Sequence, residues 1–247
     1  MSGHSHWAGI KHKKAKADAQ RGKLFSRLTR QITLAARHGG EIDTNPQLRQ
    51  AVEDAKEANM PQENIIRAIK KGTGELPGAN LEFQSYEGYG PGGVAFVVEV
   101  ITDNKNRTLA EIKHIFSKHG GSLGAPGCAV RLFKKKGIIG IETEGISEEE
   151  LMELAIGVGA EDFKIEGDQY TLITSAGDLN RIKEDLQKQG FNIAFAEITM
   201  VAENTVRVEG KKAEKILQIM EAIEEHPDVQ NVYANFDVPD EIMEKVS

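Results

Sequence analysis

The chain has 247 residues, of which 39% are hydrophobic and 28% are charged, so it can bury packed cores and is not disordered throughout. Its single cysteine, Cys128, excludes an internal disulfide framework or a thiolate metal site and fits a reducing compartment. No apolar run reaches the length of a signal peptide or a membrane span, so we expect a cytoplasmic protein with no membrane partner.

The charge is distributed very unevenly along the chain. The formal net charge is −7, yet residues 1–40 contain nine lysines and arginines and only one acidic residue, Asp18, and therefore carry +8. Residues 41–247 consequently carry −15. A protein polarised in this way has one end suited to a polyanion and a body that is not. We therefore predict that the N-terminal end binds nucleic acid.

Residues 1–20 are polar, basic and short of large apolar side chains. This composition is typical of a disordered tail, and equally of a basic arm that orders on a nucleic-acid backbone. Trp7 is available in this segment for stacking on a base. The composition alone does not choose between the tail and the arm.

Residues 17–37 have the period of an amphipathic helix. At about 100° per residue, Leu24, Leu28 and Ile32 share one face, and basic side chains lie nearly opposite. These cations could simply solvate a core helix, but an ordinary exposed face mixes both signs of charge, and this one does not. The absence of acids favours contact with nucleic acid. The predicted nucleic-acid-binding residues of the arm and helix are Lys11, Lys13, Lys14, Lys16, Lys23, Arg27, Arg30 and Arg37.

Two further helices are expected to complete a small bundle. Asn45 and Pro46 are typical of a helix cap followed by a first-turn proline. Pro61 opens a third helix, and Gly72 is expected to end it. Lys70 and Lys71 lie at the C-terminal end of that helix, where compensation of the helix dipole is favoured over a phosphate contact.

Residues 72–92 are rich in glycine and proline and predict a boundary after the bundle. Beyond them the pattern alternates between strands and helices. Residues 94–133 are expected to form strand, helix and strand, with the strands at 94–101 and 129–133, before the lysines at 134–136 break the run.

Residues 138–200 follow the order β-α-β-β-α-β, which is typical of a ferredoxin-like sandwich. Residues 205–236 again predict strand, helix and strand, and together with 94–133 they would make a second such set. We therefore predict an α+β fold with an N-terminal helical bundle followed by two ferredoxin-like α/β domains, one inserted in the other. The expected divisions are a basic arm at 1–20, a three-helix domain at 21–78, a discontinuous α/β domain at 79–133 plus 203–247, and an inserted domain at 134–202.

Two glycine motifs have the wrong context for catalysis or nucleotide binding. Residues 88–93 satisfy G-x-G-x-x-G but precede a strand rather than follow one. Residues 120–124 satisfy G-x-S-x-G, but a helix rather than a strand precedes the serine. No acid, base and nucleophile are assembled by the sequence. We predict that the protein is not an enzyme and has no catalytic residues, metal site or cofactor.

Several segments closely resemble the YebC family, in the order in which that family has them. The matching stretches are GHSHWAGIKHKK at 3–14, the runs at 59–74, 86–93, 102–108 and 116–121, and VQNVYANF at 229–236. The resemblance implies a helical N-terminal domain with two α/β domains, and a cytoplasmic protein usually described as a probable transcriptional regulator that binds DNA. The family also includes a mitochondrial translational activator, and some bacterial members are linked to ribosomes. It supplies no catalytic residues.

Three hypotheses follow. The first is a transcriptional regulator that binds DNA through the basic arm and helix. The alternative is a translation factor that binds ribosomal or messenger RNA, because backbone charge is recognised alike on both polymers. The third is a protein-interaction module whose acidic body binds a basic partner.

Overall fold

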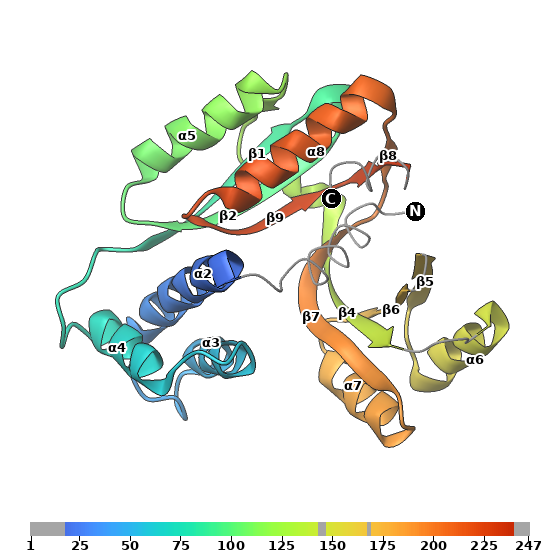
Figure 1. The fold of residues 1–247 in the computed structure, drawn as a ribbon, viewed down its shortest axis with the longest axis horizontal. Coiled ribbons are helices and arrows are strands. Elements are labelled where there is room, and N and C mark those ends of the chain that lie inside the picture. Colours follow the sequence, from blue (N-terminus) through green and yellow to red (C-terminus); the bar gives the residue numbers. More distant parts are fainter. Residues whose placement is uncertain (1–17, 143–146, 167–168, 240–247) are drawn as a thin grey trace.

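The computed structural model describes residues 18–142, 147–166 and 169–239. Within them, three helices are followed by two α/β units (Figure 1). The predicted α+β class, with a helical N-terminal part and sheet units after it, is confirmed. No helix in the described part of the chain is long and apolar enough to cross a membrane.

The N-terminal bundle consists of α2 (Asp18–Ala36), α3 (Pro46–Glu57) and α4 (Gln62–Thr73). Their apolar faces meet in one core, in which Ile32, Leu48 and Ile65 are at most 1% exposed. Asn45 caps α3 as predicted, because its side chain accepts a hydrogen bond from the backbone N–H of Leu48 at 3.0 Å.

Gly72 does not end α4, as the sequence had predicted, but lies inside it. A Cβ atom at this position would lie 2.4 Å from the carbonyl oxygen of Thr33 and 2.6 Å from the Cβ of Ala36. Glycine is therefore required here for the close crossing of α4 over α2. The helix ends instead at Thr73, and the residue that caps it, Gly74, has a left-handed φ of 85°.

The first α/β unit has an antiparallel sheet in the order β3-β1-β2-β9. Helices α5 (Lys105–Lys118) and α8 (Gly210–Glu225) cover one of its faces (Figure 1). Phe96, Phe116 and Ile216 are fully buried between the helices and the sheet. The strands are β1 (Glu82–Tyr89), β2 (Ala95–Thr102), β3 (Ser122–Leu123) and β9 (Val229–Ala234).

Two local predictions for this unit were wrong. The glycine- and proline-rich boundary contains β1, which pairs with β2 along its whole length, from Glu82 opposite Thr102 to Tyr89 opposite Ala95. The expected strand at 129–133 is instead a 3-10 turn, η2 (Val130–Leu132). No strand pairing forms here, because the side chain of Glu87 accepts hydrogen bonds from the backbone N–H groups of Ala129 and Val130.

The second α/β unit has the sheet order β5-β6-β4-β7, which is the order of a ferredoxin-like sandwich. Its core includes Ile139, Leu151, Leu172 and Ile182, each fully buried. The lysines at 134–136, expected to break the strand, lie within β4. The elements are β4 (Phe133–Glu142), α6 (Glu148–Val158), β5 (Asp162–Glu166), β6 (Gln169–Ser175), α7 (Leu179–Lys188) and β7 (Asn192–Ala202).

The strand expected at 205–208 does not join the main sheet. Instead, β8 (Val206–Arg207) pairs in parallel with β10 (Phe236–Asp237) in a separate two-stranded sheet. Its expected place beside β2 is taken by β1. The first α/β unit therefore departs from the ferredoxin-like strand order that the sequence had suggested for it.

Candidate nucleic-acid interface

Helix α2 lies between the rest of the bundle and the first α/β unit (Figure 1). Leu28 and Ile32 on its apolar face are buried in the bundle core. Its basic residues extend the other way, and each of the four predicted binding residues on this helix or at its end contacts another part of the chain.

Arg30 is bonded to the most buried carboxylate of this junction. Its guanidinium donates to the carbonyl oxygen of Ile101 at 2.7 Å and to the carboxylate of Asp228. Asp228 is only 1% exposed and also accepts hydrogen bonds from Arg107 at 2.8 Å and Thr108 at 2.6 Å. Burial alone would raise the pKa of Asp228, but these hydrogen bonds and the charge of Arg30 outweigh it and hold the pKa well below its usual range.

Arg27 and Lys23 contact the C-terminal end of α8. The guanidinium of Arg27 donates to the carbonyl oxygen of Glu224, and burial lowers the pKa of Arg27, with the charge of Glu224 opposing that shift. Carbonyl groups at a helix C-terminus carry partial negative charge, so this end attracts cations. Lys23 Nζ lies 3.3 Å from Glu225 Oε1, and both side chains are more than half exposed.

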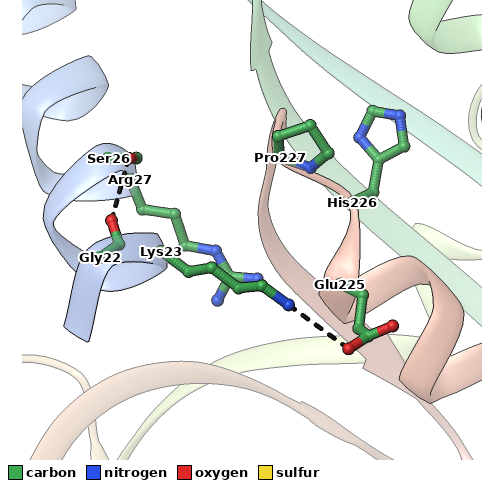
Figure 2. A pocket seen from close by; sticks show the side chains of 7 residues that line it. All are labelled: Gly22, Lys23, Ser26, Arg27, Glu225, His226 and Pro227. Carbon is green, nitrogen blue, oxygen red and sulfur yellow. Dashed lines mark hydrogen bonds and ion pairs between the residues drawn. The ribbon is translucent and has the colours of Figure 1, made fainter. Parts of the chain in front are cut away.

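Figure 2 shows the groove that remains between these two elements. It has a volume of about 320 Å³, and Lys23 and Glu225, which form an ion pair, both line it. The hydroxyl of Ser26 donates to the carbonyl oxygen of Gly22 at 2.9 Å, within α2 itself. The lining residues are Gly22, Lys23, Ser26, Arg27, Glu225, His226 and Pro227.

Arg37, just past the C-terminal end of α2, contacts the segment that leads into β1. Its guanidinium donates to the carbonyl oxygen of Leu81 at 2.5 Å and to the side chain of Asn80. The three predicted arginines of this region thus bond to acceptors far along the chain. They attach the bundle to the first α/β unit, and a contact of theirs with nucleic acid stays a prediction.

The structure gathers Lys23, Arg27 and Arg30 at one junction. Arg37 lies apart from them beside Asn80 and Leu81, and the remaining predicted residues lie outside the described part of the chain. These are Trp7, Lys11, Lys13, Lys14 and Lys16. Sequence reasoning did not find the acceptors of α2, since Asp228 is 198 residues away from Arg30 and no local pattern marks it as a partner. In the three described ranges, no group of three or more His, Cys, Asp or Glu residues could hold a metal ion.

Two family models match the chain and together span most of it. One, described as the N-terminal domain of the TACO1/YebC protein, matches residues 5–75. The other, described as the second and third domain of TACO1/YebC, matches residues 81–236. The chain belongs to the TACO1/YebC family. The resemblance seen in the sequence is therefore confirmed, and the two models meet between α4 and β1.

Relatives match this family member over their full length. A protein of Dictyoglomus thermophilum is 55% identical and covers 100% of both chains, and one of Natranaerobius thermophilus is 53% identical and covers 99% of both. Both carry the name probable transcriptional regulatory protein. The crystal structure of a conserved hypothetical protein from Aquifex aeolicus is 52% identical, with a TM-score of 0.80 over 95% of this chain and 97% of that one.

Proposed function

We propose that this protein is a cytoplasmic transcriptional regulator that binds DNA through its basic N-terminal segment. The observation that carries the proposal is the charge of residues 1–40. They contain nine basic residues and one acidic residue, whereas residues 41–247 carry −15. The names of the relatives support a regulatory role and describe a regulator rather than an enzyme.

Within the proposal, the lysines of the arm contribute most of the phosphate contacts. Arg27 and Arg30 already bond to acceptors of the first α/β unit, so these two side chains are engaged within the chain. Lys23, by contrast, is 53% exposed, and its pairing with Glu225 on the surface is weak and readily exchanged for a phosphate.

The test replaces Lys11, Lys13, Lys14 and Lys16 with glutamine. The matched control replaces four exposed lysines of α5 and α8 and removes the same charge: Lys113, Lys118, Lys211 and Lys215. Binding of a short duplex is measured over a range of salt concentrations. The arm variant should lose at least about tenfold in affinity, and its salt slope should fall by roughly one unit for each phosphate that it no longer neutralises. Equal behaviour of the two variants would remove the arm from the interface.

A second candidate is a factor that binds ribosomal or messenger RNA. The observation that favours it is the same polarity, because an acidic body with one basic end suits a protein that reaches into an RNA-lined cleft. Ultraviolet crosslinking in living cells, followed by sequencing of the attached nucleic acid, separates the two. DNA clustered at promoters supports the regulator, and ribosomal RNA at one site supports the translation factor.

A further inference from the structure

We propose that the outer face of α4 is a second contact surface for the nucleic-acid backbone, formed by Arg67, Lys70 and Lys71. This inference rests on the proposed function and adds to it a surface within the folded bundle. It follows from which cations of the bundle are already engaged and which are available.

The three side chains are exposed and available. Within residues 18–142, 147–166 and 169–239, none of them forms a hydrogen bond or an ion pair. The cations of α2 differ, since Arg27 and Arg30 bond to the first α/β unit. Two of the α2 arginines are thus engaged within the chain, whereas all three cations of this α4 cluster are exposed and available.

The geometry of α4 places these cations together on one side. Ile65 and Ala68, each 1% exposed, face the bundle, and the carbonyl oxygen of Ala68 accepts a hydrogen bond from the hydroxyl of Thr33 in α2 at 3.2 Å. At about 100° per residue, Arg67, Lys70 and Lys71 fall within a sector of roughly 100° on the opposite side. Arg67 and Lys71 are one turn, about 6 Å, apart along the axis. All three can thus meet one extended polyanion.

Compensation of the helix dipole does not account for the whole cluster. Lys70 and Lys71 lie in the last turn of α4, where cations stabilise any helix, but Arg67 lies in the middle. The two acids nearest to the cluster in the sequence have local roles. Glu63 lies in the first turn, where the dipole favours an acid, and Glu75 accepts a hydrogen bond from Thr73 at 2.9 Å.

Ile66, which precedes Arg67 in the sequence, also lies on the surface of α4 and is 45% exposed. An apolar group beside unpaired cations suits the sugar–phosphate backbone, which presents apolar sugar edges between charged groups. The same N-terminal part of the chain carries the +8 segment, and both surfaces have the positive charge that a polyanion requires. These features favour nucleic acid over an acidic protein as the partner of α4.

The experiment compares the wild-type chain with two triple variants and with the arm variant described above. The test variant is R67Q/K70Q/K71Q. The control is K211Q/K212Q/K215Q, which removes the same charge from three exposed lysines of α8 that also make no ion pair within the described residues. Fluorescence anisotropy with a labelled duplex DNA and a labelled single-stranded RNA is recorded from low to moderate salt. Thermal unfolding should show both variants folded at the temperature of the measurement, with the α4 variant slightly less stable because it loses two cations in the last turn of the helix.

The α4 variant should bind at least about tenfold more weakly than wild type, with a salt slope smaller by roughly two to three units. The α8 control should change affinity less than about twofold. If the wild type and the arm variant differ but the α4 variant matches the α8 control, the α4 surface is refuted and the proposed function stands. If the wild type binds neither polymer, the proposed function fails and this inference fails with it.

Discussion

The guanidinium of Arg30 in α2 donates a hydrogen bond to the carboxylate of Asp228, which lies between α8 and β9. Asp228 is 1% exposed and accepts further hydrogen bonds from Arg107, Thr102 and Thr108. One buried carboxylate therefore accepts hydrogen bonds from both the bundle and the first α/β unit. The orientation of these two parts depends on it.

Replacing Asp228 with alanine should lower the free energy of unfolding by about 3 kcal/mol, because Arg30 and Arg107 would lose their shared partner. Replacing Arg30 with alanine should cost less, about 1–2 kcal/mol, since Asp228 would keep Arg107 and two threonines. Urea unfolding of both variants measures the difference. An Arg30 variant less stable than the Asp228 variant would contradict this account of the cluster.

Acid should weaken the same junction. A carboxyl group whose folded pKa is depressed contributes stability that is present above its unfolded pKa, near about 3.9, and is lost as the pH falls towards the folded value. The stability advantage of wild type over Asp228→Asn should thus be constant near neutral pH and shrink below about pH 4. Unfolding free energies measured across this range test the prediction. A gap that widened on acidification would refute it.

Glu87 should hold the loop around Cys128 in place. Glu87 is 7% exposed, and its carboxylate accepts hydrogen bonds from the backbone N–H groups of Gly127, Ala129 and Val130 at 2.6–2.8 Å. Burial would raise the pKa of Glu87, but these three hydrogen bonds outweigh it and lower the pKa. Both oxygens of this carboxylate accept hydrogen bonds, but in Glu87→Gln the amide nitrogen cannot accept one. At least one backbone N–H group should therefore lose its partner, and part of the loop should be released.

Reaction of Cys128 with a thiol reagent measures that opening, and the chain has no other cysteine to confuse the signal. The rate should rise about tenfold in Glu87→Gln, which corresponds to a loss of about 1.4 kcal/mol of loop stability. The exposed residue Glu53 supplies the control, since Glu53→Gln should leave the rate unchanged. Equal rates in both variants would show that the loop does not depend on Glu87.

The crossing of α2 and α4 should not tolerate a methyl group at Gly72. Alanine improves helix propensity by about 1 kcal/mol, but its Cβ would meet the backbone of Thr33, so Gly72→Ala should destabilise the protein by about 1–3 kcal/mol. Gly157 in α6 has open space around it, and Gly157→Ala should be neutral or stabilising. Thermal unfolding compares them. A stabilised Gly72→Ala would show that the crossing can widen.

Features specified by neighbouring residues could be predicted from the sequence. Asn45 was recognised as a helix cap, and the structure shows its side chain accepting the expected backbone hydrogen bond. The strand and helix order of the second α/β unit also follows from local periodicity. Its ferredoxin-like topology could be inferred because all six elements are consecutive.

Features specified by distant partners could not be predicted. Strand β1 has few buried side chains in its first half, so its hydrophobic pattern is weak, and pairing with β2 defines it. The expected strand at 129–133 does not form because Glu87, more than 40 residues earlier, takes its backbone N–H groups. The arginines of α2 look like a free basic face until Asp228 and Glu224 are brought beside them by the fold.

The second α/β unit is connected to the first through neighbouring residues at both of its ends. Phe133 at the start of β4 pairs with Ala202 at the end of β7, and the backbone N–H of Glu203 donates to the carbonyl oxygen of Leu132 at 3.0 Å. A single in-frame deletion joining Leu132 to Glu203 would therefore remove the unit and leave every strand pair of the first sheet intact. At the level of the gene, such a unit can be gained, lost or exchanged in one recombination event.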